Sequence, residues 1–203
     1  MTIHLHHGDL PDGLDLGAQV AIDCETLGLI PHRDRLCLVQ LSAGDGDAHL
    51  VQIEKRQTQA PNLTRLLADP EVLKLFHYGR FDIAVMLHAF GVRAAPVYCT
   101  KIASKLVRTY TDRHGLKNLC SELIDVDLSK VQQSSDWGAP HLSKAQQEYA
   151  ASDVLYLHRL KAVLDARLER EGRMPLAQAA WDFLPARAEL DLRGWPEMDI
   201  FSH

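Results

Sequence analysis

The sequence predicts an α/β fold with a mixed central sheet flanked by helices. Short apolar segments with strand-like composition alternate with segments of helical spacing, and that alternation is typical of helices packed on a sheet. The 203 residues are 46% hydrophobic and 24% charged, which fits one globular domain with a substantial core. The formal net charge of −5 argues against a basic surface that grips long nucleic acid.

Three strands are predicted in the first quarter of the chain. Residues 19–23, 36–42 and 48–53 are mainly apolar, and GDGD at 44–47 supplies a turn between the last two. We expect these strands to form an antiparallel meander.

The middle of the chain predicts two further strands and the helices that follow them. A Pro-Asn start and apolar spacing indicate a helix at 60–69, and a buried strand is expected at 72–77. A helix at 79–91 follows and ends at Gly91. The segment VYCT at 97–100 then predicts a strand that leads into another helical segment.

A long amphipathic helix is predicted from Ser143, its N-cap, to about Glu171. No repeat or low-complexity linker divides the chain, so we expect a single domain over 1–203, with a core of about 1–171 and a helical tail of about 172–203. Three aromatic residues of the tail are interpreted as core or subunit contacts: Trp181, Trp195 and Phe201.

Cysteine spacing and the N-terminal sequence indicate a cytoplasmic protein. The four cysteines are widely separated in apolar segments, unlike the close pairs of zinc sites, and predict buried reduced thiols: Cys24, Cys37, Cys99 and Cys120. Neither a signal peptide nor a membrane span is indicated.

Paired acids at the end of the first strand are the strongest chemical signal. Asp23 and Glu25 project to the same side of a strand, and Asp82 lies early in the helix after a buried strand. Tyr149 and Asp153 share one helical face. Because unpaired buried carboxylates are costly, this set predicts two bound divalent cations, Mg²⁺ or Mn²⁺.

Such a metal pair indicates phosphodiester hydrolysis. One metal activates a water and the other stabilises the leaving oxygen, while Tyr149 is placed to orient the water. Each pair of residues alone occurs by chance, but the ordered set is more specific.

The segments IDCETLGL, FHYGRFD and YAASD resemble the three motifs of DEDD exonucleases. The resemblance implies a ribonuclease-H-like fold and metal ligands at four positions: Asp23, Glu25, Asp82 and Asp153. A histidine five residues before the last aspartate marks the DEDDh branch, but this sequence has Glu148 there, followed by Tyr149. It therefore resembles the DEDDy, ribonuclease D-like branch of 3′-5′ exonucleases.

Over nearly the whole chain the sequence is similar to the compact bacterial exoribonucleases of the nano-RNase C family. The shared segments include ETLGLIPHRDRLCLVQLS, CTKIASKLVRTYTDRHGLKNLC, QQSSDW and LDLRGWPEMDIF. This resemblance implies no helical accessory domain, a homo-octamer, and short RNAs, particularly diribonucleotides, as substrates that are cut to nucleoside 5′-monophosphates.

Residues beside the motifs are candidate substrate contacts. Thr26 and Leu27 follow Glu25, and Leu27 is placed either to wedge between two bases or to pack in the core. His77 and Tyr78 precede Asp82 and either hold the substrate or close the strand. A basic segment, residues 100–118, is the best local source of phosphate ligands: Arg108, Arg113, His114 and Lys117. The polar loop from Gln133 to Trp137 is either a flap or a connector.

Two alternatives remain open from the sequence. In the first, the protein is a general ribonuclease D-like trimmer of longer RNA or DNA. In a different class, the domain is a non-catalytic nucleic-acid-binding module whose acids hold a structural metal.

Overall fold

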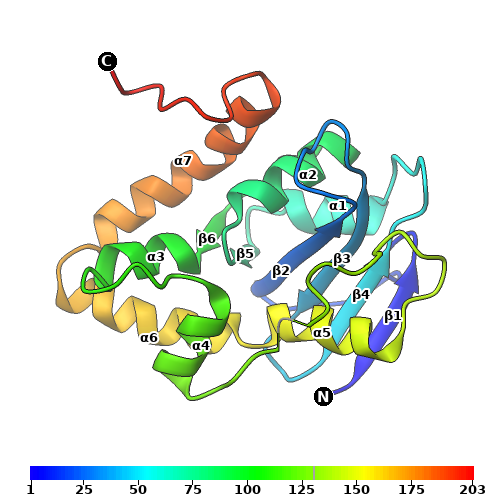
Figure 1. The fold of residues 1–203 in the computed structure, drawn as a ribbon, viewed down its shortest axis with the longest axis horizontal. Helices are drawn as coiled ribbons and strands as arrows, with labels where there is room; N and C mark the ends of the chain where they lie inside the picture. The colour runs from blue at the N-terminus through cyan, green and yellow to red at the C-terminus, as the bar shows by residue number, and fades with distance from the viewer. Residues whose placement is uncertain (130) are drawn as a thin grey trace.

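A mixed β-sheet forms the centre of the computed structural model, which describes residues 1–129 and 131–203 (Figure 1). Within these residues the sheet has six strands in the order β1-β4-β3-β2-β5-β6. The strands are β1 (Ile3–His7), β2 (Gln19–Thr26), β3 (Leu36–Ser42), β4 (Ala48–Gln52), β5 (Leu73–Phe76) and β6 (Val97–Cys99). The mixed central sheet that the sequence predicts is therefore present.

The antiparallel meander of β2, β3 and β4 is confirmed. β2 pairs with β3 and β3 pairs with β4, both antiparallel, while β5 and β6 join the other side of β2 in parallel. β2 extends farther than predicted, because it continues through the two acids to Thr26. Glu25, predicted to lie just beyond the strand, is therefore within it together with Asp23.

β1 is a strand that the sequence analysis missed. It pairs in parallel with β4 at the edge of the sheet, with His4 opposite His49 and Leu5 opposite Leu50. An edge strand of alternating histidine and apolar residues has no buried run to identify it, and its partner comes from a distant part of the chain. Pairing with β4 rather than local pattern creates this strand.

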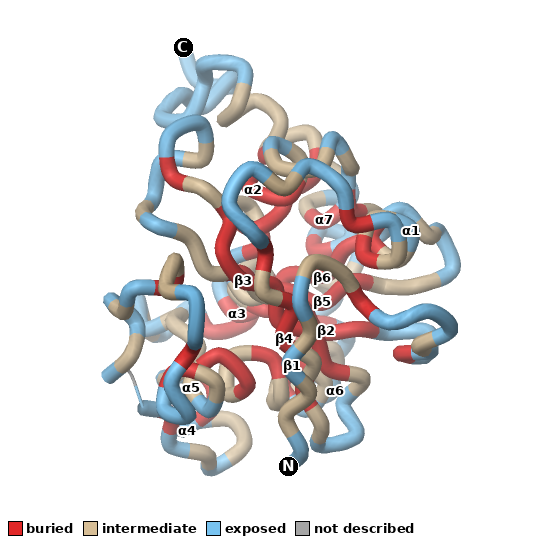
Figure 2. Tube along the Cα trace, turned by 90° about the vertical axis from the view of Figure 1, so that its right-hand side faces the viewer, coloured by how far each residue is buried: buried red, intermediate tan, exposed pale blue. Residues whose placement is uncertain are grey.

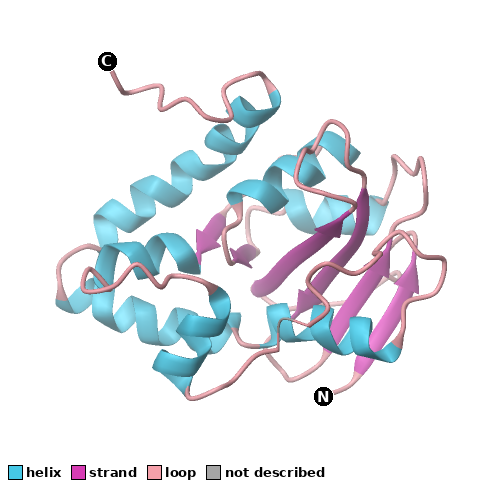
Figure 3. Ribbon diagram, viewed as in Figure 1, coloured by secondary structure: helices cyan, strands magenta, loops and turns pink. Residues whose placement is uncertain are grey.

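Helices cover both faces of the sheet (Figures 1 and 3). α5 lies across one face over β2, β3 and β4, whereas α1 and α2 lie on the other. The helices are α1 (Pro61–Ala68), α2 (Arg80–Phe90), α3 (Thr100–Val107), α4 (Leu116–Ile124), α5 (Lys144–Leu155), α6 (Leu157–Arg170) and α7 (Met174–Leu192). α7, the tail helix, packs along α2 and β6.

The predicted helix from Ser143 to Glu171 is two helices. Its start is confirmed, since Ser143 and Gln146 form a reciprocal capping box. The helix breaks at Tyr156, whose backbone angles are φ −109° and ψ −2°. The break redirects the chain, so that α5 packs on the meander while α6 packs against α3 and α4.

Buried residues gather where the sheet meets the helices (Figure 2). A smaller apolar cluster lies between α5 and the meander and includes Leu38, Leu50, Trp137 and Ala150. In the tail, Trp181 is buried, whereas Trp195 and Phe201 are exposed. All four cysteines are free and buried, as predicted. In the described residues, no helix is long and apolar enough to cross a membrane.

Candidate active site

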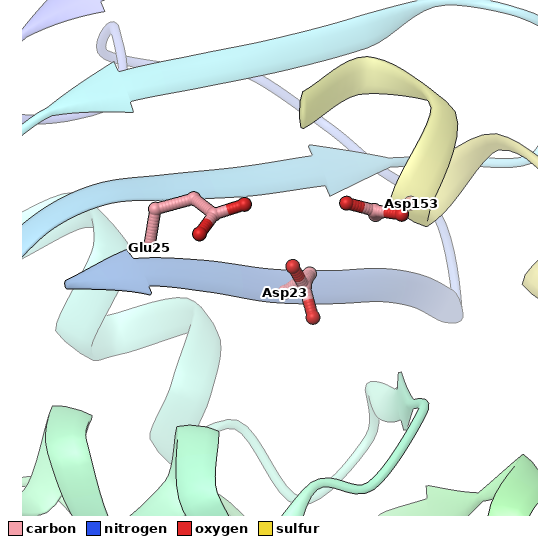
Figure 4. A group of neighbouring side chains, drawn as sticks. All are labelled: Asp23, Glu25 and Asp153. Atoms are coloured by element: carbon pink, nitrogen blue, oxygen red, sulfur yellow. The ribbon is translucent and has the colours of Figure 1, made fainter. Parts of the chain in front are cut away.

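Three carboxylates meet between β2 and α5. Asp23 and Glu25 project from one face of β2, and Asp153 reaches them from α5 (Figure 4). One carboxylate oxygen from each residue lies within 4.8 Å of the others. The alternation of a strand and the placement of α5 over the meander bring together residues that are more than a hundred positions apart in sequence.

Asp82, the fourth predicted acid, lies beside β2 on the side that faces β5. β5 pairs with β2 only along Gln19–Ala21, so the backbone of β2 is unpaired on that side beyond this point. Asp82, in the first turn of α2, accepts hydrogen bonds at Oδ1 from the backbone N–H and the thiol of Cys24, both at 3.1 Å. Asp82 therefore lines the same cavity as the three carboxylates but is outside the group whose oxygens lie within 4.8 Å of one another.

The four acids are desolvated and lack a cationic partner. Among the ion pairs of the described residues, none involves Asp23, Glu25, Asp82 or Asp153. Burial is the main cause that raises their pKa values above the ordinary range, and mutual repulsion adds to it at Asp23, Glu25 and Asp153. For Glu25 the pKa rises to about 9.

This arrangement fits a divalent cation. Carboxylate oxygen is the donor that Mg²⁺ and Mn²⁺ prefer, and one oxygen from each of the three closest carboxylates lies within 4.8 Å of the others. Four like charges that are buried together are unfavourable unless a cation offsets them. The donor set and its missing counter-charge both point to a metal site.

Tyr149 lies one turn before Asp153 on the same face of α5. Its ring packs near the buried Trp137, with the two ring centroids 6.0 Å apart. Burial, followed by the nearby Asp153 and Glu25 charges, raises the pKa of the Tyr149 hydroxyl. The hydroxyl thus stays protonated at neutral pH and is available as a hydrogen-bond donor.

A cavity of about 670 Å³ opens over the acids. Five of the predicted substrate contacts line it: Thr26, Leu27, His77, Tyr78 and Lys117. Leu27 is 54% exposed, so its side chain is presented to the cavity rather than packed in the core. The polar loop contributes Gln133, Ser134, Ser135 and Trp137 to the lining.

His77 and Tyr78 form one corner of this cavity together with Lys101. His77 Nδ1 lies 2.9 Å from Thr100 Oγ1, and burial, aided by Lys101, lowers the His77 pKa to about 3. Tyr78 has a left-handed backbone with φ 65°, and Lys101 Nζ lies 3.9 Å from its ring centroid. The corner offers a neutral imidazole, an exposed ring and a cation.

Three predicted contacts of the basic segment lie outside the cavity lining. Arg108 is fully buried, and its guanidinium donates to Glu122, to Ser104 Oγ and to the Arg113 carbonyl. His114 Nδ1 lies 2.9 Å from Ser104 Oγ. Arg108, Arg113 and His114 are absent from the lining, so the prediction of a basic phosphate cluster does not match this geometry.

Lys101 is a cation of the cavity lining that the sequence analysis did not select as a substrate contact. It begins the basic segment but points back to the site from the first turn of α3, directly after β6. Its position after a parallel strand, at the edge of the sheet where Asp82 also lies, was the available signal. Lys117, by contrast, lines the cavity as predicted but also pairs with Asp127 at 3.2 Å.

Comparison with known proteins identifies the family of this arrangement. A model of the 3′-5′ exonuclease family matches residues 11–169. A structure of Brucella melitensis NrnC with bound Mg²⁺ is 64% identical with a TM-score of 0.97, and the match covers 100% of both chains. A structure of the same protein bound to pGG is 65% identical, also with a TM-score of 0.97, and the match covers 100% of this chain and 99% of that chain.

Ribonuclease D proteins are the curated relatives. That of Gluconacetobacter diazotrophicus is 39% identical over 155 residues, which are 76% of this chain and 39% of the relative. The chain thus spans about two fifths of the length of the first curated relatives it matches. The chain belongs to the 3′-5′ exonuclease family, as a DEDD-type, ribonuclease D-like member that resembles NrnC.

Proposed function

We propose that the protein is a metal-dependent 3′-5′ exoribonuclease of the DEDDy type that releases nucleoside 5′-monophosphates. The observation that carries this proposal is the group of partly buried carboxylates that have no cationic partner among the described residues and lie beside the Tyr149 hydroxyl. Membership of the 3′-5′ exonuclease family supports the direction of cleavage.

Asp23, Glu25, Asp82 and Asp153 would hold two divalent cations, Mg²⁺ or Mn²⁺. When bound, these ions supply the charge that activates a water and stabilises the leaving 3′ oxygen. Asp82 is held by Cys24 through Oδ1 and lines the same cavity, so its carboxylate would be available as the fourth ligand. The Mg²⁺ in the NrnC structure supports a divalent ion.

Tyr149 would orient the attacking water. Its protonated hydroxyl donates a hydrogen bond, and the carboxylates around it accept the proton that the water loses. The contact with Trp137 fixes the ring, so the hydroxyl keeps its direction. The residue at position 149 thereby defines the DEDDy type of site.

The substrate is proposed to be short single-stranded RNA, particularly diribonucleotides. Leu27 would lie between two bases, and Tyr78 would stack on one of them. Lys101 and Lys117 would bind phosphate oxygens. A cavity of about 670 Å³ has room for a ligand of roughly dinucleotide size, and the pGG-bound NrnC structure supports the same class.

A substrate-length series tests this proposal. Purified protein is incubated with 5′-labelled RNAs of two to ten nucleotides, with and without Mn²⁺, and products are resolved over time. We expect metal-dependent release of monophosphates with the fastest turnover on the dinucleotide. Equal rates at all lengths, or equal rates on matched DNA, would favour a general trimmer, and the absence of release would favour a non-catalytic binding module.

Self-association is a further part of the proposal. The C-terminal segment after α7 exposes Trp195, Met198, Ile200 and Phe201, and an apolar surface of this kind is typical of an interface. Together with the resemblance, it supports a homo-octamer. Light scattering on the purified chain is expected to give eight times the monomer mass, and a monomeric mass would contradict it.

A further inference from the structure

A buried glutamine lies directly opposite Asp23 in the sheet. Gln40 on β3 is the cross-strand partner of Asp23 on β2, so both side chains project to the same face. Gln40 has no exposed surface. Its amide nitrogen lies 3.5 Å from Asp23 Oδ2 and donates to that oxygen.

The surroundings of Gln40 give no other use for its amide. Leu38, on the same face of β3, and Leu50, opposite on β4, are both fully buried. Within the described residues, Gln40 Oε1 has no hydrogen-bond partner. A buried amide with an unpaired oxygen is unfavourable, and an apolar residue of similar size would fit this seam better. Packing of the apolar seam therefore does not explain an amide at position 40.

The carboxylate of Asp23 supplies that reason. Asp23 lies among other acids, and a lysine or arginine beside it would compete with a divalent cation for its oxygens. An amide N–H stabilises one carboxylate oxygen without adding positive charge, and leaves the other oxygen free. Partners behind the ligands of a metal site commonly fix ligand direction in this way.

We propose that Gln40 is a positioning residue, whose amide holds the Asp23 carboxylate in the orientation that binds a divalent cation. This inference rests on the proposed function, since it concerns the same metal site. It adds a residue from β3 to a site whose ligands come from β2, α2 and α5. Gln40 acts through Asp23 and has no contact with substrate in this role.

The test is a Gln40→Met variant of the full chain, which keeps the size of the side chain but removes the donor. Mn²⁺ binding to the substrate-free protein is measured by calorimetry, and the melting temperature is measured without metal. We expect Mn²⁺ affinity to fall by about 10-fold to 100-fold. The melting temperature without metal is expected to be unchanged or higher, because an unpaired buried amide has been removed.

Ser42→Ala is the matched control. Ser42 is buried on the same face of β3, two residues from Gln40, but its hydroxyl donates to the Asp47 carbonyl at 2.6 Å, away from the acids. This variant is expected to lower the melting temperature while Mn²⁺ affinity stays within about twofold. Kinetics provide a second measurement, since raising Mn²⁺ is expected to restore the kcat of Gln40→Met.

Two results would overturn the role of Gln40. One is wild-type Mn²⁺ affinity in Gln40→Met, and the other is a loss of affinity that is matched by a fall in metal-free melting temperature. The proposed function fails in a different way. A wild-type chain that binds Mn²⁺ but releases no nucleotide contradicts hydrolysis and leaves the comparison of Mn²⁺ affinities valid.

Discussion

The four acids of the site and the basic segment, residues 100–118, differ in what the fold does with their charges. The acids come from separate elements and converge without a cationic partner. The basic segment resembles a ligand-binding patch in sequence. In the fold, however, the Arg108 guanidinium donates its hydrogen bonds to Glu122, to Ser104 Oγ and to the Arg113 carbonyl. Charge density in a sequence therefore indicates a binding site only where the fold leaves the charge unpaired.

The contrast has an energetic side. Burying like charges together without a partner lowers the stability of the folded state. Such a cluster is typical of a site where a bound ligand offsets the repulsion. Burying one arginine against a glutamate and several acceptors favours the fold instead. Loss of one of the acids should therefore lower activity and raise metal-free stability, whereas loss of Arg108 should lower stability and leave activity near the wild-type value.

Asp153→Asn is the strongest way to test the acidic side of this comparison. We expect turnover to fall by at least about 10³-fold, because a ligand to the proposed metals is lost. The free energy of unfolding without metal should rise by about 1–2 kcal/mol, since one of four repelling charges is gone. Glu148→Gln, an exposed acid on the same helix, is the control, and turnover near the wild-type value in Asp153→Asn would refute the site.

Tyr149→Phe separates the orientation of water from the binding of metal. The variant keeps the ring against Trp137 but loses the hydroxyl, so kcat should fall by about 10²-fold to 10³-fold. Mn²⁺ affinity from calorimetry should stay within about twofold. Tyr156→Phe, at the break between α5 and α6, is the control; a parallel fall in metal affinity in Tyr149→Phe would contradict a role limited to the water.

Arg108→Met tests the basic side. Ser104 Oγ and the Arg113 carbonyl lose their donor, whereas Glu122 is exposed enough to be solvated, so chemical denaturation should show a loss of about 1–2 kcal/mol. At a temperature where the variant is folded, kcat/KM should stay within about twofold. Arg113→Ala, an exposed neighbour, should change neither quantity, and a tenfold rise in KM for Arg108→Met would return Arg108 to the substrate site.

Stability against pH tests the repulsion directly. The folded pKa of Glu25, about 9, lies above its value of 4.5 in an unfolded chain, so the folded state binds more protons between these values. The stability of metal-free protein should therefore fall as pH rises from about 5 to 9. We expect the free energy of unfolding to fall by about 2 kcal/mol over this range, which lowers the melting temperature by about 4–8 °C.

Excess Mn²⁺ is the control for the pH measurement. The ion offsets the ionised carboxylates, so it should remove most of the fall and raise the melting temperature more at pH 8 than at pH 5. A melting temperature that does not depend on pH or on Mn²⁺ would show that the acids are not buried against one another.

Lys101→Met sharpens the comparison within the basic segment itself. Because Lys101 lines the cavity, its loss should raise the KM for a dinucleotide by about tenfold, equivalent to about 1.4 kcal/mol. Folding stability and kcat should change little. Lys105→Met, exposed one turn later on α3, is the control, and an equal rise in KM in both variants would indicate a general charge effect.

Sequence patterns predicted the parts of the fold that local chemistry determines. The strand at Leu36–Ser42, the Gly91 end of α2 and the N-cap at Ser143 depend on neighbouring residues, and all three are confirmed. β1 and the break at Tyr156 were missed because each is decided by distant packing. β1 forms by pairing with β4, which is distant in sequence. The helix breaks at Tyr156 because α5 packs on the meander while α6 packs against α3 and α4.

The same division applies to the site. Asp23, Glu25, Tyr149 and Asp153 could be selected because each is a polar residue in an apolar context at a regular spacing. The partner of Arg108 could not be predicted, because no sequence pattern indicates that Glu122 accepts hydrogen bonds from its guanidinium. Gln40 did have a signal that was not used: it is a lone amide in an apolar strand, opposite Asp23 in the predicted meander.

The placement of α5 over the meander has a consequence for how the protein is made. Asp23 is synthesised early, but its partner Asp153 leaves the ribosome more than a hundred residues later. Closing so long a stretch of chain is entropically costly and is repaid only when the helix docks. A nascent chain that ends before α5 accordingly carries Asp23 and Glu25 but no assembled metal site, so the proposed nuclease becomes active only after Asp153 has been synthesised and α5 has docked.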